Sequence, residues 1–312
     1  MTRLVLVMRD LSECEADDIL SFSFRKDAYL PYTKLSAAFT ADVSDTDEIA
    51  EVKLYSDSQL IHHGSADTID MRKSGGVQKI YITSSGFTAQ LCKNQIEPGL
   101  KMNISLNSLM DDFCTLPYVT HENNSDTSNY IYVKQNTAMW DAVASLSYKL
   151  GGTYPYIRGT NTVRITPVPQ PEEFCFTEES CLFSGKAADR RKLGSHYHMA
   201  DINGDYGQYD YTDSLTLSYR LVRHNYSELD MRFLYSPMQA LEYRDKLDCR
   251  GMKSRYIVYS GYRGEDLWDR LFLGGQLIGR ITSVEINGNS KGITTKTGVY
   301  TDKFPKEPSQ ER

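Results

Sequence analysis

Short β-forming runs alternate with turn signals through the first third of the chain, and this pattern limits the fold more than any other feature. Val52–Tyr55 and Leu60–His63 flank Ser56–Gln59, which predicts a hairpin with a four-residue loop. Ser74-Gly75-Gly76 predicts a second tight turn, followed by a strand over Val77–Ser84. Strands at this spacing are typical of an antiparallel sandwich or barrel.

Other parts of this region fit the same pattern. Glu13–Asp18 indicates an acidic turn or a short helix. Further strands are expected over Leu4–Met8, Phe22–Phe24, Leu35–Phe39 and Asp67–Met71. The 22 tyrosines of the 312-residue chain also suit pleated, half-buried surfaces and interfaces.

Charge and hydropathy exclude two classes of protein. The formal charge is −6, and the acidic isoelectric point of 5.6 argues against a dedicated nucleic-acid binder, which needs a basic field. Mean hydropathy is −0.47, and no run approaches the roughly 18 apolar residues of a membrane span. The apolar run within Met1–Asp10, Leu4–Met8, is too short for the hydrophobic region of a signal peptide, so synthesis in the cytoplasm is expected.

The middle of the chain predicts a small strand–helix–hairpin unit. Tyr130–Val133 indicates a strand, and Thr137 is expected to cap a helix that ends at Gly151-Gly152. A hairpin is then expected around Gly159-Thr160-Asn161. Before this unit, the spacing of apolar residues predicts a helix over Ser105–Phe113. In the later helix, which follows Thr137, one face would carry Trp140, Val143, Leu146 and Leu150.

The prolines at 167, 169 and 171 form a stiff linker and mark the clearest domain boundary. We expect alternating strands over Ser214–His224 and Ser227–Leu234. A Ser236 capping box should open a helix that ends at Gly251, and Asp266–Leu273 indicates a short helix or turn. The final hairpin would pair 277–287 with 292–301, and the tail 303–312 would be frayed.

This organisation predicts a mainly β protein of three domains. A first barrel-like β domain would cover 1–99, and a small α/β domain 100–168. A second barrel-like β domain would cover 169–312, with a helical insertion at about 236–273.

The sequence predicts no metal, cofactor or catalytic residues. His196 and His198 would share one face of a strand, with Asp201 close by, but no third ligand follows at a standard spacing, so a polar loop or interface is favoured. His62 and His63 would point to opposite faces of their strand and cannot chelate. The cysteines form no CxxC pair and are interpreted as reduced and structural: Cys14, Cys92, Cys114, Cys175, Cys181 and Cys249.

Charge is distributed unevenly along the chain. Residues 10–70 hold 14 acidic and 4 basic side chains, a net charge of −10, which leaves +4 on the remainder. Gly185–Lys192 is a basic run that is either a solvated loop or a site that docks an acidic surface of another subunit. The asymmetry fits head-to-tail stacking of subunits, or serves solubility alone.

Tyrosines concentrate in one stretch of the chain, around the sequence GDYGQYDY at 204–211. Such a Tyr- and Gly-rich segment is either a recognition or assembly surface, or a long ordered loop that packs on itself. The members are Tyr197, Tyr206, Tyr209, Tyr211, Tyr219 and Tyr226.

The order of these parts resembles a known family. VKLYSDSQLIHHGSADTIDM is followed by NQIEPGL, by SLNSLMDDF, by the segment from Tyr130 to Pro169, and by ITSVEINGNSKGITTKTGVY. Over roughly residues 30–302 this resembles the baseplate hub proteins of contractile phage tails and phage-tail-like particles, the late-control and Mu-type hub group. Residues 172–213 are not explained by the pattern.

The resemblance implies a non-enzymatic, structural homotrimer with two related β-barrels per chain, situated between the tail tube and the central spike. Further partners would be baseplate wedge and tape-measure proteins, and the chain would be part of a phage tail, tailocin or other contractile injection system. No single functional residue transfers.

An alternative function is suggested by the segment from Tyr130 to Pro167, which resembles a LysM unit of glycan-binding proteins. LysM units usually carry a Gly-Asp-Thr-like turn before the helix, whereas Lys134–Thr137 stands here. The alternative is therefore a peptidoglycan-binding tail or cell-wall protein, and an enzyme fused to such domains is a third reading.

Overall fold

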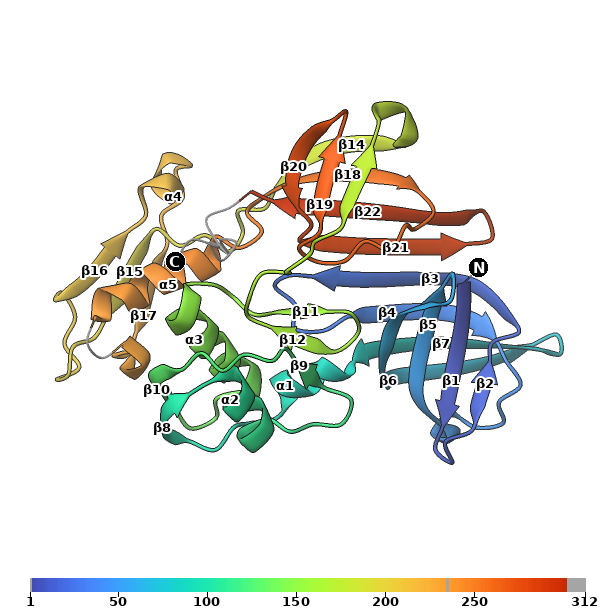
Figure 1. The fold of residues 1–312 in the computed structure, drawn as a ribbon, viewed down its shortest axis with the longest axis horizontal. Coiled ribbons are helices and arrows are strands. Elements are labelled where there is room, and N and C mark those ends of the chain that lie inside the picture. Colours follow the sequence, from blue (N-terminus) through green and yellow to red (C-terminus); the bar gives the residue numbers. More distant parts are fainter. Residues whose placement is uncertain (1, 234–235, 302–312) are drawn as a thin grey trace.

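The computed structural model describes residues 2–233 and 236–301, and their fold is mainly β (Figure 1). An eleven-stranded antiparallel sheet dominates, and four smaller sheets accompany it in the described residues. The large sheet has two edge strands and does not close on itself. The expected mainly β class with additional helices is confirmed.

The first 86 residues supply seven strands of the large sheet. Their order from the middle of the sheet to its edge is β3-β4-β7-β6-β5-β1-β2. Inward side chains such as Leu4, Phe39 and Val52 are fully buried in one apolar core. The bounds are β1 Thr2–Met8, β2 Glu13–Glu15, β3 Asp18–Asp27, β4 Lys34–Thr40, β5 Ile49–Ser56, β6 Gln59–Ser74 and β7 Val77–Gly86, with the 3-10 helix η1 at Thr46–Glu48.

Two local predictions in this region are wrong. The β5–β6 hairpin turns on two residues, Asp57 and Ser58, because both adopt the positive φ that two-residue hairpin turns require. The pairing Ser56↔Gln59 therefore belongs to the ladder and not to a loop. Glu13–Glu15 is an edge strand, since its backbone pairs with β1.

The carboxyl-terminal strands continue the same sheet. β21 (Ser283–Asn289) pairs with β3, and the order then runs through β22 (Gly292–Tyr300) and β18 (Lys253–Ser260) to the edge strand β14 (Phe183–Ala188). Side chains from both halves of the chain share one core. Gly288 is required at the junction, because a Cβ there would lie 2.0 Å from the ring of Phe22.

The middle segment has a separate core built on its helices. Trp140 of α3 is buried, and its indole Nε1 donates to the Tyr154 hydroxyl at 3.0 Å. The cap of α3 is Ala138, so the expectation that Thr137 caps this helix is wrong, whereas Gly152 ends it in the left-handed conformation. The bounds are η2 Phe87–Ala89, α1 Gln90–Lys93, β8 Gly99–Ile104, α2 Leu106–Phe113, β9 Thr120–His121, β10 Ser128–Val133, α3 Met139–Gly151, β11 Tyr156–Arg158 and β12 Thr162–Arg164.

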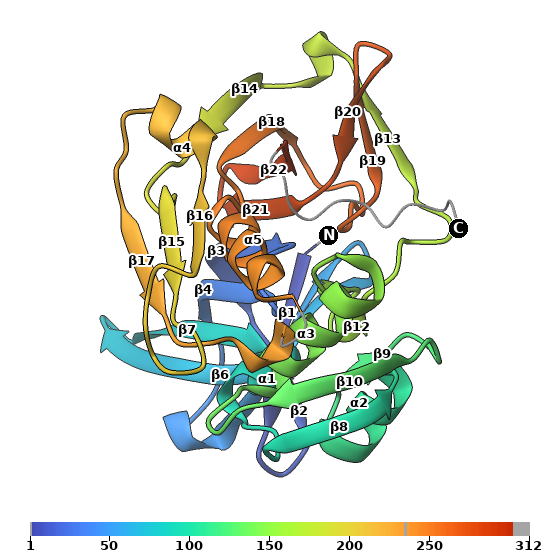
Figure 2. The same cartoon turned by 90° about the vertical axis from the view of Figure 1, so that its left-hand side faces the viewer.

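Residues 196–227 form a three-stranded sheet in the order β16-β15-β17, and helix α5 lies against one of its faces (Figure 2). The strands expected over Ser214–His224 and Ser227–Leu234 are wrong. Asp213 accepts hydrogen bonds from the backbone of Leu215 and Thr216 and so caps a helix there. The bounds are β15 His196–Met199, β16 Tyr209–Thr212, α4 Ser214–Ser218, β17 His224–Ser227, η4 Met231–Phe233 and α5 Pro237–Asp248.

The insertion expected at about 236–273 is helical only in its first part. Helix α5 ends at Asp248 and not at Gly251, and Ser236 makes no capping hydrogen bond through its side chain. Strand β18 follows. Of the expected short helix or turn over Asp266–Leu273, residues 267–268 form a turn, whereas Arg270–Leu273 form strand β19. β19 lies between β13 (Glu173–Phe176) and β20 (Gln276–Arg280), while η3 covers Glu178–Ser180. The expected frayed tail 303–312 lies outside the described residues.

A buried lysine joins three parts of the chain. Lys26 of β3 is 5 % exposed, and its ammonium donates to the Gly159 carbonyl at 2.7 Å and to the Asp266 carboxylate. Asp266 also accepts from the Gly159 amide at 2.8 Å. Nearby, Arg158 donates to the buried Asp269. The β11–β12 hairpin is thereby fixed against β3 and against the 266–269 segment that follows β18.

Candidate functional site

Three histidines stack on one face of the β16-β15-β17 sheet. His196 and His198 share a face, as the sequence predicts, and the parallel pairing of β15 with β17 brings His224 beside them. The His196 and His224 ring centroids are 4.4 Å apart, and those of His198 and Tyr226 are 4.6 Å apart. His224 was missed because its segment was assigned to a different strand, and no spacing in the sequence signals it.

Hydrogen bonds within the stack disfavour a metal site. His198 contacts Asp210 Oδ1 at 2.7 Å through Nδ1 and His224 Nδ1 at 3.0 Å through Nε2. Nearly parallel stacked rings direct their nitrogens along parallel planes, whereas a metal needs lone pairs that converge on one point. Asp201, which the sequence placed near these histidines, instead accepts from the amides of Asn203 and Asp205 in its own turn.

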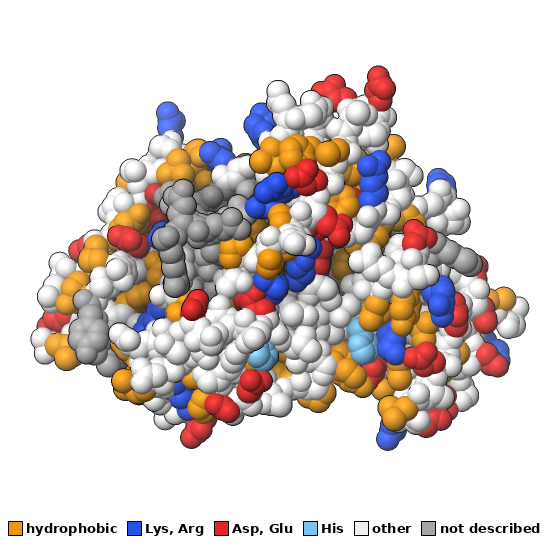
Figure 3. All heavy atoms as spheres, in the orientation of Figure 1, with side chains coloured by type: hydrophobic (Ala, Val, Ile, Leu, Met, Phe, Trp, Pro, Cys, Tyr) orange, Lys and Arg blue, Asp and Glu red, His pale blue; other side chains and the backbone are white. Residues whose placement is uncertain are grey.

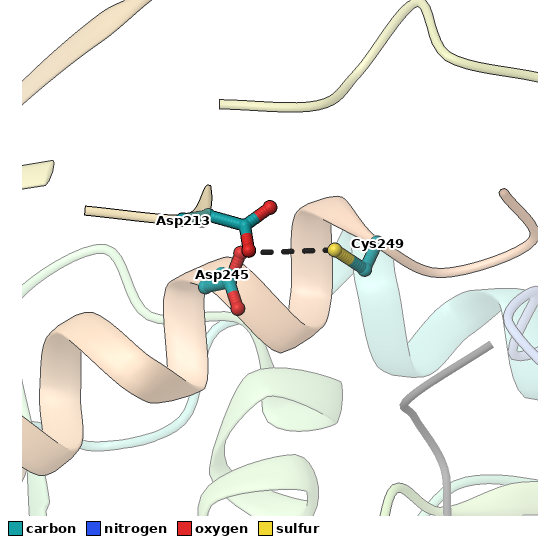
Figure 4. A group of neighbouring side chains, drawn as sticks. All are labelled: Asp213, Asp245 and Cys249. Atoms are coloured by element: carbon teal, nitrogen blue, oxygen red, sulfur yellow. Dashed lines mark hydrogen bonds between the residues drawn. The ribbon is translucent and has the colours of Figure 1, made fainter. Parts of the chain in front are cut away.

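One group of potential ligand atoms does converge among residues 2–233 and 236–301. Asp213, Asp245 and Cys249 are all buried, and their side chains point toward one another (Figure 4). Asp213 already accepts from the backbone and hydroxyl of Thr216, and Asp245 accepts from Tyr211 and from the Cys249 thiol at 3.7 Å. We interpret this group as a buried polar network that ties α4 to α5.

The neighbouring histidines His62 and His63 and the cysteines occupy different surroundings. His62 is fully buried between the hydroxyls of Thr33 and Ser84, each 2.8 Å away, and burial lowers its pKa to about 3. His63 contacts Glu51 instead. All six cysteines are free thiols, and burial raises the pKa of Cys114 to about 12, which makes it a poor nucleophile.

The tyrosine-rich stretch divides into inner and outer tyrosines. Tyr197, Tyr209 and Tyr211 belong to the core beneath α5, and the Tyr197 hydroxyl donates to Asp248 at 2.9 Å. Tyr206 and Tyr226 are 50 % and 64 % exposed, and their rings meet edge to face. The outer tyrosines extend the histidine stack into an aromatic surface, which is suited to contact with another molecule.

Exposed side chains elsewhere mark a second surface at the edge of the large sheet. Strand β14 is almost wholly exposed, and Leu182 and Phe183 are 59 % and 56 % exposed. A groove of about 420 Å³ runs between this strand and β20, lined by Lys186, Arg255 and Leu277 among others. Figure 3 shows one face of the molecule, on which charged and apolar side chains are mixed. Unpaired edge strands of this kind invite a partner.

Known structures resemble this fold over nearly its whole length. A tail protein of Neisseria meningitidis MC58 shares 12 % identity at a TM-score of 0.67, with 95 % of each chain covered. A 43 kDa tail protein of prophage MuSo2 from Shewanella oneidensis shares 12 % identity at a TM-score of 0.69, with 96 % of this chain and 98 % of that chain covered. No protein-family model and no curated protein sequence matches the chain.

A third similar structure comes from a secretion system. It is an E. coli component of the type VI secretion system with structural similarity to the T4 bacteriophage tail proteins gp27 and gp5. Its identity to this chain is 8 % at a TM-score of 0.56, with 97 % of this chain and 79 % of that chain covered. The chain therefore has the fold of phage tail proteins, which confirms the resemblance found in the sequence at the level of the fold.

In the described residues, no helix is long and apolar enough to cross a membrane.

Proposed function

We propose that the chain is a structural hub of a contractile tail baseplate, a trimeric adaptor that joins the tail tube to the central spike. The observation that carries this proposal is the likeness in fold to two tail proteins over at least 95 % of each chain. This likeness spans both halves of the large sheet and the middle segment. It therefore supports a structural role in which extended surfaces, and not a cleft, bind the partners.

The proposal includes two barrel-like units per chain, one formed by residues 1–99 and one by 169–312, with residues 100–168 as a small domain between them. Backbone hydrogen bonds support curling of the first unit, because Ala16 N donates to Leu4 O and Asp17 N to Thr40 O. Three chains with two such units would present six similar positions to a six-fold tube. The small domain would keep its LysM-like strand, helix and hairpin without a role in glycan binding.

The proposed partners are a tube protein, a spike protein, and baseplate wedge and tape-measure proteins. One similar structure is a Francisella PdpA–VgrG complex, at 10 % identity, a TM-score of 0.53 and coverage of 60 % of that chain. We assign the chain no catalysis, cofactor or metal. It would be made in the cytoplasm of a bacterial host and become part of a phage tail or tail-like particle.

Copy number within the particle tests the proposal. Particles purified from the host would be digested and the chain quantified by mass spectrometry against labelled standards of this chain and the tube protein. The expected result is three copies per particle, co-purifying with tube and spike. Six copies per particle, or loss of the chain on washing while tube and spike remain, would contradict the hub assignment.

A further inference from the structure

Basic side chains gather where the 189–193 turn meets the end of α4, and we call this surface the basic end. Arg223 holds the turn by donating from Nη1 to the carbonyls of Arg190 at 3.1 Å and Arg191 at 2.7 Å. The Arg190 guanidinium lies over the Tyr219 ring, 3.8 Å from its centroid. Its charged residues are Arg190, Arg191, Lys192, Arg220 and Arg223, and all are exposed.

Basic side chains outnumber acidic ones at the basic end, where Asp189 pairs with Arg191 and Asp248 interacts electrostatically with Lys192. Asp189 pairs with Arg191 at 2.5 Å, and that arginine is nevertheless 88 % exposed. Val222 stands between two of the arginines and is 65 % exposed. The basic end therefore combines excess positive charge with one exposed apolar side chain.

An acidic surface lies on the connections between the first β strands and on η1, and we call it the acidic end. Its residues are Asp10, Asp17, Asp42, Asp45 and Glu48, and all are exposed. Three of these line one surface pocket of about 460 Å³. Asp17 and Asp42 lie near Cys14, whose pKa is raised by burial and then by these two carboxylates. Leu11, beside Asp10, is 76 % exposed, and Arg9 is the one basic residue that lines the pocket.

The two ends lie far apart in the molecule. Figure 1 places α4 at one end of the longest axis, at the left, and β1 and β2 toward the other, at the right. The basic end and the acidic end of one chain are therefore too far apart to contact each other. They match between two copies that are arranged in the same direction.

We propose that the basic end of one copy docks on the acidic end of the next copy, in a heterologous contact that repeats around a closed ring. Charge complementarity selects a second copy as the occupant, and Val222 and Leu11 supply apolar contact within the charged rims. A heterologous contact closes into a ring where its rotation permits. This inference rests on the proposed trimer and names the contact that would hold it.

Charge reversal at each end tests the contact with the full-length chain. The basic-end variant carries Arg191→Glu, Lys192→Glu and Arg220→Asp, the last chosen because position 220 has φ +59° and Asp tolerates that conformation. The acidic-end variant carries Asp42→Lys, Asp45→Lys and Glu48→Lys. A matched control reverses three exposed lysines elsewhere, through Lys73→Glu, Lys79→Glu and Lys291→Glu. Circular dichroism verifies that each variant folds.

Self-association is measured by sedimentation equilibrium at about 25 mM salt, where screening is weak. The unaltered chain and the control should associate alike, and each single-end variant should weaken association at least about tenfold. A mixture of the two single-end variants should regain association, because the intact basic end of one variant meets the intact acidic end of the other, and their two reversed ends also carry opposite charges. A chain with both ends reversed should regain association to within about threefold of the unaltered chain.

Several results would overturn the contact. Monomeric behaviour of the unaltered chain, equal association of all variants, or failure of the doubly reversed chain to recover would each reject it. If the basic-end variant self-associates like the unaltered chain, and particles that carry this variant lose another protein, the basic end docks that other protein and the proposed contact is rejected. Three copies per particle combined with any of these results would reject the contact and leave the hub proposal standing.

Discussion

His62 provides a sharp test of how burial controls stability in the first β strands. Its imidazole is fully buried and burial lowers its pKa to about 3, whereas the unfolded chain has the ordinary value of 6.5. Between these two values the unfolded chain binds a proton that the folded chain does not. The stability associated with neutral His62 is therefore complete above pH 6.5 and is lost as pH falls toward 3.

The two pKa values set the size of this loss. The slope reaches about 1.4 kcal/mol per pH unit below pH 6, so the free energy of unfolding should fall by about 3 kcal/mol between pH 7.5 and pH 4 from this residue alone. His62→Gln removes the titrating ring. Its curve of stability against pH should lack this contribution, although other groups still titrate.

Guanidinium denaturation at a series of pH values measures the difference between the unaltered protein and His62→Gln. Ser84→Ala is the matched control, since it removes one 2.8 Å hydrogen bond to the ring but keeps the imidazole. The control should lower stability at neutral pH by about 1 kcal/mol and retain the pH slope. Parallel pH curves for His62→Gln and the unaltered protein would refute the reasoning.

Four further perturbations test other parts of the structure. Lys26→Met should lower the free energy of unfolding by about 3–5 kcal/mol, because the Asp266 carboxylate and the Gly159 carbonyl lose their buried ammonium partner. A double-mutant cycle with Asp266→Asn should give a coupling energy above about 1 kcal/mol. A loss below about 1 kcal/mol for Lys26→Met in denaturation experiments would contradict this role. Trp140→Ala should lower the free energy of unfolding by about 3–5 kcal/mol. Trp140→Phe loses chiefly the hydrogen bond to Tyr154 and should lower it by less. Equal losses of stability for the two variants in calorimetry would count against the packing argument. Thiol titration in denaturant without reductant should find six free thiols, and elemental analysis no stoichiometric metal; one bridge or one zinc per chain would overturn both expectations. The full-length chain should not sediment saturably with purified peptidoglycan, and saturable retention would favour the alternative cell-wall function.

Local signals were sufficient for much of the fold. The strands of the first region and the helix that carries Trp140 follow from alternation, helical spacing and turn residues. The last hairpin is confirmed only in part: 283–289 pair with 292–300, whereas 276–280, which the prediction placed largely in the same arm, form β20 and pair with β19. The sequence failed where a side chain decided between two local states. Asp213 caps a helix in a stretch that alternates like a strand, and Asp57 and Ser58 make a tighter turn than their residue types required.

Long-range pairing accounts for what the sequence could not provide. Register between β3 and β21 joins segments about 260 residues apart, and nothing in either strand specifies that partner. The same limit applies to the histidine stack, since His224 reaches His196 only through the parallel pairing of β15 and β17. Charge asymmetry was visible in the sequence, but the fold was needed to locate the basic and acidic ends.

Three-dimensional reconstruction of the assembled particle tests the hub assignment most directly. The account predicts a ring of three copies on the tail axis, between tube and spike, with both β regions on the ring and interfaces above roughly 1,000 Å² per chain pair. Finding this chain in six copies, or as a peripheral fibre away from the tube axis, would contradict it.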